Sequence, residues 1–304
     1  MPRRFGAIGA ITLATLSVTN APPIPTPVSQ PSTAATAAVT TPRPARAAAH
    51  AAAPIVDVGH RGTRAYAPEN TIAAFREGIA RHADVVEFDV RQTKDHKLIV
   101  MHDATPARTT NVEKIFPKRS PWRVGDLTLR QVKRLDAGSW FTKRYKGERV
   151  PTLAETLRAM DGTGAALLLE VKDPARYPGI GSRVIAELRA HAGWLTPGRL
   201  VVQSFDWGFV KSFHARLPAV TTAVLGTPSS GELTSVRSYA DLVNPTHGDV
   251  TKAYVARAHR LGLRVYPWTV DDPAEMRRLV ADKVDGIISN RPDVLRRVLD
   301  RRQT

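Results

Sequence analysis

The sequence predicts an α/β fold, specifically a TIM (β/α)8 barrel with a small insertion after the second strand. From residue 54 onward, short β-rich runs alternate with stretches of helical length, and eight of these runs fit the parallel strands of a barrel. This part of the chain is about 250 residues long, which is the usual size of one TIM barrel. An open doubly wound sheet fits this number of strands less well.

The strands are expected where apolar and β-branched residues gather in short runs. They are predicted at residues 55–59, 84–90, 166–172, 200–204, 219–225, 242–244, 264–269 and 286–289. Amphipathic helices are predicted at residues 71–82, 181–191 and 252–261, because apolar side chains recur there at helical spacing. This alternation of strand and helix is what favours a parallel sheet.

Two stretches depart from the alternation. Residues 97–102 follow the second strand too closely for a parallel crossover, so they are predicted to add an antiparallel hairpin strand. Residues 104–150 contain basic residues, Pro121, Trp122 and Trp140 in no regular rhythm. We expect this segment to form the insertion and to pack over the rim of the barrel.

The first 53 residues are predicted to lie outside the folded domain. Arg3 and Arg4 precede a mainly apolar stretch at residues 5–18, and Ala21 ends a small-residue cleavage site. Residues 1–21 are therefore predicted to be a secretory signal peptide, with the Sec and twin-arginine routes both open. Residues 22–53 hold 11 Ala, 7 Pro and 7 Ser or Thr, a composition typical of a disordered linker. The domain is expected at residues 54–304, without a transmembrane segment in the mature chain.

Composition excludes several classes of protein. The chain has no Cys, which removes disulfide scaffolds, zinc ribbons and thiol nucleophiles. Its 44 basic and 28 acidic residues give a net charge of +16. Only four basic residues and no acidic residue precede residue 54, so the predicted domain carries +12. Such a charge suits nucleic acid, anionic lipid or a phosphorylated substrate, and it does not choose among them.

Three carboxylates lie toward the carboxyl ends of predicted barrel strands, where a TIM barrel builds its active site. Glu87 and Asp89 lie two residues apart in the second strand, so both point toward the barrel axis. Glu170 ends the next barrel strand. Buried like charges are costly without a cation between them, and oxygen ligands favour a hard cation. The three residues therefore predict a site for one divalent cation, either Ca²⁺ or Mg²⁺.

Cationic and imidazole side chains are predicted at the same rim. His60 and Arg61 end the first strand, His102 ends the hairpin strand, and Lys172 follows Glu170 by two residues. Arg61 and Lys172 can bind an anionic group, and two histidines can act as general acid and base near neutral pH. Together with a cation, these residues indicate cleavage of a phosphoester.

The sequence resembles the glycerophosphodiester phosphodiesterase family over residues 55–297. The matching motifs, in chain order, are Gly59-His60-Arg61-Gly62, Pro68-Glu69-Asn70-Thr71, Glu87-Phe88-Asp89-Val90, Val100-Met101-His102-Asp103, Arg108-Thr109-Thr110, Pro151-Thr152-Leu153, Glu170-Val171-Lys172, Gln203-Ser204-Phe205, Pro267-Trp268-Thr269-Val270 and Arg291-Pro292. One departure is His96, which stands where the family usually has Gly in a turn. We expect Asp95-His96 to form that turn, because both residues tolerate left-handed backbone.

The resemblance implies a TIM barrel and metal-dependent hydrolysis of a small-molecule glycerophosphodiester to glycerol 3-phosphate and an alcohol. It implies that His60 and His102 are the acid–base pair, without saying which is which. The metal ligands implied are Glu87, Asp89 and Glu170, the phosphate-binding residues are Arg61 and Lys172, and Trp268 lines the glycerol or leaving-group side.

Several readings stay open at this point. Asn70 fits an N-cap of the helix predicted at residue 71 better than a contact to substrate, and we expect it to act from behind the ligands. The chain could instead act like a phospholipase D on lysophospholipids or sphingolipids, although related toxins usually have disulfides. It could also be a non-catalytic binder of an anionic cell-surface polymer. Nucleic acid is not expected as a partner, because no nucleic-acid module is recognisable in a secreted chain.

Overall fold

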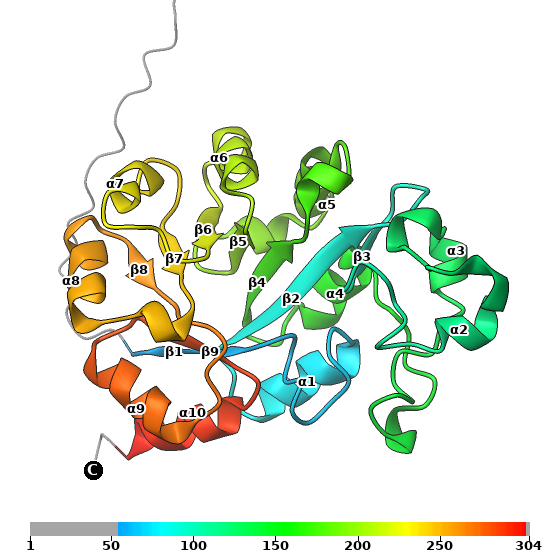
Figure 1. Cartoon of the computed structure of the whole chain (residues 1–304), viewed down its shortest axis with the longest axis horizontal. Coiled ribbons are helices and arrows are strands. Elements are labelled where there is room, and N and C mark those ends of the chain that lie inside the picture. Colours follow the sequence, from blue (N-terminus) through cyan, green and yellow to red (C-terminus); the bar gives the residue numbers. More distant parts are fainter. Residues whose placement is uncertain (1–53, 302–304) are drawn as a thin grey trace, which may run out of the picture. The chain divides into compact units, whose positions relative to one another are not determined.

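A computed structural model describes residues 54–301, and the predicted signal peptide and linker lie outside these residues. The described residues form one sheet of nine strands surrounded by helices (Figure 1). The strands are β1 (Val56–Gly59), β2 (Val85–Gln92), β3 (Leu98–Val100), β4 (Ala166–Val171), β5 (Leu200–Ser204), β6 (Thr221–Leu225), β7 (Leu242–Asn244), β8 (Arg264–Val265) and β9 (Gly286–Ser289).

Eight strands pair in parallel in the order β8-β7-β6-β5-β4-β2-β1-β9. The two ends of this path meet through backbone hydrogen bonds, including Asp285 N to Val265 O and Ile288 N to Pro267 O, each 3.0 Å long. The barrel predicted from the sequence is therefore confirmed. The last but one strand was predicted to reach residue 269, but β8 ends at Val265. Pro267 has no N–H to continue the ladder, which accounts for the early end.

Strand β3 pairs antiparallel with the far end of β2, with Val90 opposite Val100, as the hairpin prediction requires. The turn between these strands passes through His96, which has a φ of 60°. The Asp95-His96 pair therefore forms the left-handed turn in which the family usually has Gly. Gln92 lies within hydrogen-bond distance of the His96 ring, 3.1 Å away, which holds the turn against the strand.

Helices follow most of the strands and lie around the barrel (Figure 1). They are α1 (Ile72–Ala80), α2 (Val112–Ile115), α3 (Leu129–Val132), α4 (Leu153–Met160), α5 (Ile180–Ala190), α6 (Trp207–Arg216), α7 (Glu232–Val236), α8 (Lys252–Arg260), α9 (Pro273–Ala281) and α10 (Pro292–Asp300). The predicted helices correspond to α1, α5 and α8. Among residues 54–301, no helix has the length and apolar character needed to cross a bilayer.

Alternating side chains of the strands supply two cores. On β2, Val86, Phe88 and Val90 are fully buried against the surrounding helices. The inner face of the barrel is apolar at one level, where Val58 and Leu168 pack together, and polar farther along the strands. Successive side chains of a β-strand point to opposite faces. Phe88 points toward the surrounding helices, so its neighbours Glu87 and Asp89 point toward the inside of the barrel.

The insertion predicted at residues 104–150 lies between β3 and β4. It contains α2, α3 and three short 3₁₀ turns, and in Figure 1 it lies to one side of the barrel, beyond β3. It has its own apolar core, in which Val112, Leu127 and Leu135 pack with Ile99 of β3. The prediction that this segment packs over the rim of the barrel is therefore only partly correct. Most of the segment lies beside the hairpin of β2 and β3, and a few of its side chains reach the rim.

Candidate active site

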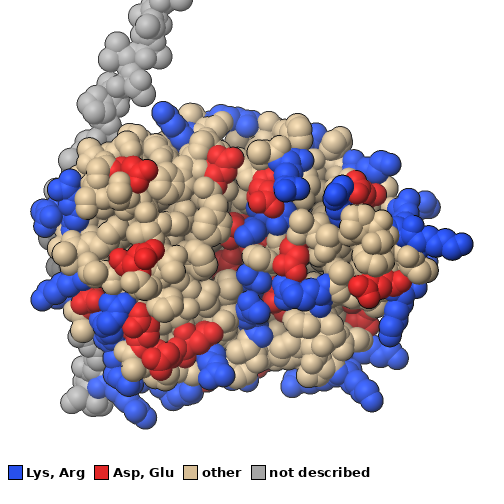
Figure 2. Space-filling view, in the orientation of Figure 1, with Lys and Arg blue, Asp and Glu red and all other residues tan. Residues whose placement is uncertain are grey.

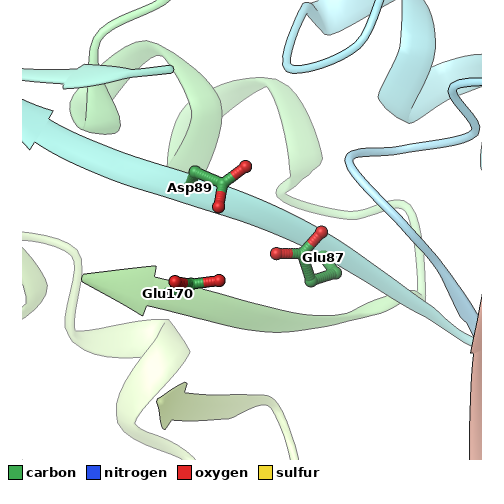
Figure 3. Close-up of side chains that lie close together, drawn as sticks. All are labelled: Glu87, Asp89 and Glu170. Atoms are coloured by element: carbon green, nitrogen blue, oxygen red, sulfur yellow. The ribbon is translucent and has the colours of Figure 1, made fainter. Parts of the chain in front are cut away.

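Three buried carboxylates meet inside the barrel. Glu87 and Asp89 come from β2 and Glu170 from the neighbouring strand β4, where it pairs directly with Asp89 in the register of the two strands. One oxygen from each carboxylate lies within 4.8 Å of the others. Figure 3 shows the three groups gathered between the two strands. The sequence placed them on one face, and the structure brings them together.

Cationic and amide groups surround the cluster. Arg61 donates its backbone N–H to Glu87 Oε2 at 2.6 Å, and its Nε lies 3.4 Å from Asp89 Oδ2. Lys172 Nζ lies 2.6 Å from Glu170 Oε1 and 3.8 Å from Asp89 Oδ1. Both phosphate-binding candidates thus lie at the cluster.

The carboxylates are not fully neutralised by these partners. Burial, followed by the charges of Asp89 and Glu170, raises the pKa of Glu87 well above its ordinary value. Burial and the charge of Asp89 raise the pKa of Glu170 to about 8. Burial also acts upward on Asp89, but Arg61 and Lys172 outweigh it and lower the pKa of Asp89. A divalent cation would stabilise all three ionised forms, and oxygen ligands alone suit Mg²⁺ or Ca²⁺. The residues present therefore fit such a cation.

The turn after β1 places His60 and Arg61 beside this cluster. Arg61 has a φ of 52°, a left-handed conformation that is uncommon outside Gly and points its N–H at Glu87. Gly62 follows with a φ of 88°, and an added Cβ there would lie 2.6 Å from the backbone of Ala74 in α1. The close approach of this turn to α1 explains why the second Gly of the Gly-His-Arg-Gly motif must be Gly.

The His60 ring is held by an amide. Its Nδ1 lies 2.7 Å from Asn290 Oδ1, and Asn290 Nδ2 donates to Asp271 Oδ2 at 2.6 Å. Because the Asn290 amide nitrogen is committed to a carboxylate, its oxygen faces the ring, so Nδ1 carries the proton and Nε2 keeps its lone pair. Burial, and then the charge of Arg61, lowers the pKa of His60 to about 4. The ring is therefore neutral at neutral pH.

The His102 ring is held by a carboxylate instead. Its Nδ1 lies 2.7 Å from Asp103 Oδ1, which can only accept. The hydrogen bond with His102, followed by those from Arg108, holds the pKa of Asp103 far below its ordinary value, although burial acts in the other direction. Asp103 is therefore ionised beside the His102 ring. Met101, the preceding residue, donates its N–H to Asp89 O at 2.8 Å, which ties this histidine to the level of the cluster.

Two aromatic residues form the apolar part of the rim. Trp268 donates its indole N–H to Asn244 O at 2.7 Å, and its ring meets Phe205 edge to face at 5.5 Å. Phe205 is half exposed, and Lys172 Nζ lies 5.5 Å from the centre of its ring. Trp268 thus lies near one of the phosphate-binding candidates, on the side where Phe205 offers an open face.

Asn70 does not cap a helix, so that sequence-based interpretation is wrong. Thr71 is the N-cap of α1, because its side chain accepts from the N–H of Ala74. Asn70 instead donates to Asp89 Oδ2 at 2.8 Å and accepts from the Asp89 N–H at 3.1 Å. Its φ of 60° frees the side chain for this pair of bonds. Asn70 therefore supports Asp89, a candidate metal ligand, from behind.

Sequence reasoning missed the residues that hold the charged groups in place. Glu69 and Arg108 belong to two of the motifs of the family resemblance, but no sequence pattern pairs them across 39 residues. Asn290 lies 230 residues from His60, and only the closure of the barrel brings the two together. In Figure 2, acidic atoms lie in a recess near the middle of this face with basic atoms beside them, in keeping with this arrangement.

Comparison with known proteins agrees with this geometry. Residues 60–294 match the model of the glycerophosphoryl diester phosphodiesterase family. A glycerophosphodiester phosphodiesterase of Bacillus subtilis is 34% identical over 261 residues, covering 80% of this chain and 86% of that protein. One from Caldanaerobacter subterraneus is 32% identical and covers 78% of this chain and 95% of that protein.

Among solved structures, a phosphodiesterase of Oleispira antarctica in complex with the product sn-glycerol-3-phosphate has a TM-score of 0.73 and 25% identity. The alignment covers 81% of this chain and 97% of the other. The matched range, residues 60–294, spans both histidines, the three carboxylates and the basic side chains of Arg61 and Lys172. On the strength of this match and of relatives more than 30% identical along most of their length, the chain belongs to the glycerophosphoryl diester phosphodiesterase family.

Proposed function

We propose that this enzyme hydrolyses glycerophosphodiesters to glycerol 3-phosphate and an alcohol, with one divalent cation and with His60 and His102 as base and acid. One observation carries the proposal: two differently held histidines flank a buried cluster of three carboxylates. Family membership supports the phosphodiesterase class, and the product bound to the Oleispira antarctica relative supports the glycerol phosphate part of the substrate.

The phosphate would be bound from the open end of the barrel by Arg61 and Lys172, which lie on opposite sides of Asp89. Glu87, Asp89 and Glu170 would hold the cation. When bound, a divalent cation offsets negative charge on the non-bridging phosphate oxygens. Arg61 is oriented for the same role by its bond to Glu69, with 2.8 Å between Nη1 and Oε1. Trp268 and Phe205 would line the part of the site beyond Lys172.

His60 is suited to act as the general base. It is neutral, its proton is on Nδ1, and its Nε2 can accept a proton from the attacking oxygen. That oxygen belongs either to water or to the 2-hydroxyl of the glycerol, which would give a cyclic phosphate that water then opens. A substrate with its 2-hydroxyl methylated separates the routes: unchanged turnover would exclude the internal attack.

His102 is suited to act as the general acid. With Asp103 ionised behind Nδ1, the ring can carry a second proton on Nε2 and give it to the departing alkoxide. One turnover leaves His60 with the proton of the attacking water and His102 without the proton given to the alcohol. His60 then releases a proton to solvent and His102 takes one up, so the pair consumes no net proton. The leaving alcohol departs neutral, which matters most for alcohols of high pKa.

The cation requirement is tested by chelation and add-back. Removal should lower kcat by about 10²–10³-fold, since the charge of the transition state is then met by two side chains only. Addition of Ca²⁺ or Mg²⁺ should restore kcat and raise the melting temperature, because it relieves the repulsion among Glu87, Asp89 and Glu170. In Glu170→Gln, added metal should neither restore kcat nor raise the melting temperature. Glu113 in α2 is exposed, and Glu113→Gln serves as the matched control. Full activity after chelation would contradict the proposal.

Substrate class is tested by a panel. Glycerophosphocholine, lysophosphatidylcholine and an anionic polymer such as polyphosphate distinguish the hydrolase from a phospholipase D-like enzyme and from a polymer binder. We expect release of glycerol 3-phosphate from the first substrate at the highest kcat/KM. Preferential turnover of the second, or polymer binding by an inactive wild type, would overturn this expectation.

We also propose that the enzyme is exported. Arg3, Arg4 and the apolar residues 5–18 support this, as does the Ala/Pro-rich stretch at residues 22–53. N-terminal sequencing of protein recovered outside the cytoplasm tests it, with a new terminus close to residue 22 as the expected result. Retention of Met1 in the recovered protein would contradict the proposal.

A further inference from the structure

Arg108, in the insertion, contacts two carboxylates that belong to different parts of the site. Its Nε donates to Asp103 Oδ2 at 2.7 Å and its Nη2 to Asp103 Oδ1 at 3.1 Å. Its guanidinium also donates to both oxygens of Glu69, at 2.9 and 2.7 Å. All these bonds are charge-assisted, and the planar guanidinium can make them at once where an ammonium could not.

Glu69 extends this contact to the phosphate-binding side. The carboxylate is 4% exposed and accepts from Arg61 Nη1 at 2.8 Å as well as from Arg108. Asp103, at the other end, holds Nδ1 of His102. A continuous series of ion pairs therefore runs from His102 through Asp103, Arg108 and Glu69 to Arg61.

We propose that Arg108 is a positioning residue that fixes the general acid relative to the bound phosphate. The inference rests on the proposed function. Among residues 54–301, Asp103 has hydrogen bonds from the side chains of His102 and Arg108 only. His102 is itself about one-third exposed. The backbone of this segment is tied to β2, since Arg91 donates to His102 O at 2.8 Å, but among residues 54–301 the Asp103 carboxylate reaches Glu69 only through Arg108.

A purely structural role for Arg108 makes a different prediction. If it merely joined the insertion to the barrel, its removal would lower stability and slow all substrates alike. A positioning role acts through the proton given to the leaving group, so the loss should depend on that group. A p-nitrophenolate leaves without a proton, whereas the choline alkoxide needs one.

The test compares Arg108→Gln with wild type on glycerophosphocholine and on the p-nitrophenyl ester of glycerol 3-phosphate. We expect kcat/KM to fall about 10- to 100-fold for the choline ester and less than about threefold for the nitrophenyl ester. Arg108→Lys should fall between, since it keeps the charge but cannot bridge both carboxylates. His102→Ala should show the same selectivity, and adding Arg108→Gln to it should cost little more.

Arg149→Gln is the matched control, because the Arg149 guanidinium donates to the carbonyls of Arg134 and Leu135, which lie within the insertion and away from the carboxylate cluster. It should slow neither ester, even if it lowers the melting temperature. Equal losses on both esters in Arg108→Gln would overturn the inference, as would a His102→Ala variant without leaving-group selectivity. If wild type cleaved neither ester, the proposed function itself would fail, which is a distinct result.

Discussion

The two histidines of the site are held by different means, although both stand at the carboxyl end of a strand. His60 is bound by the amide of Asn290, with Asp271 behind it, and both partners follow barrel strands or lie near them. His102 is bound by Asp103, which depends on Arg108 from the insertion. One side of the site is therefore built by the closed barrel and the other by an ion-pair series that a surface segment completes.

This difference gives the two rings different electrostatic surroundings. An amide oxygen accepts a hydrogen bond without adding charge, so burial dominates and lowers the pKa of His60 to about 4. Asp103 stays ionised because His102 and Arg108 donate to it, so a negative charge lies beside the His102 ring. The roles of base and acid that we propose for His60 and His102 rest on these different partners.

Removing either imidazole ring should give the largest losses in kcat, and the two losses should depend differently on the leaving alcohol. His60→Ala should lower kcat by about 10²–10⁴-fold on every phosphodiester, because a base is needed whatever alcohol leaves. His102→Ala should show a similar loss only where the alcohol has a high pKa. Rates on alkyl and nitrophenyl esters measure this, with metal content checked in each variant. Equal losses for both variants on both esters would contradict the assignment.

Exchanging the partners of His60 should give a smaller and pH-dependent effect. In Asn290→Asp/Asp271→Asn, the amide and the carboxylate trade places with the same shape and total charge, and His60 gains a carboxylate partner. The pKa of His60 should rise from about 4 toward or above its ordinary value. A base is lost when it is protonated, so the acid limb of kcat/KM should move to higher pH.

At pH 5 the exchanged variant should therefore be about tenfold slower than wild type, while the two converge above pH 8. The single variant Asp271→Asn, which keeps the amide on His60, separates the effect of charge from that of position. An acid limb that stays at the pH of wild type would show that His60 is not the base.

The metal-ligand candidates on the barrel strands could be predicted from the sequence, whereas the residues that hold the two histidines and Arg61 in place could not. Strand periodicity turned Glu87 and Asp89 inward, and parallel neighbours brought in Glu170, because β-strand geometry is regular. Glu69, Arg108 and Asn290 depend on contacts between segments far apart in the chain, which no local pattern encodes. Asn70 was misread for a related reason, since a capping residue and a buried hydrogen-bond partner look alike in sequence.

Asp57 in β1 is a buried acid without the basic partners that Glu69 has, and it should lower the free energy of unfolding when it ionises. Its replacement should give the smallest effect of the changes proposed here. Its side chain is fully buried, and within the described part of the chain neither oxygen has a hydrogen-bond partner. Burial raises the pKa of Asp57 to about 9. The folded state keeps Asp57 protonated below about pH 9, whereas the unfolded chain ionises it above about pH 4. Wild type should therefore lose stability as the pH rises between these values.

Asp57→Asn removes this titration but keeps the shape. The variant should match wild type near pH 4 and be more stable by about 1–3 kcal/mol near pH 8, a rise of several degrees in melting temperature for a domain of this size. Urea unfolding at both pH values measures the difference, and the exposed Asp161→Asn provides the control. Parallel stability curves for wild type and Asp57→Asn would mean that another group relieves this carboxyl. In that case buried acids in this barrel would be partnered in general, and the pairing of Glu69 with Arg61 and Arg108 would not be special to the active site.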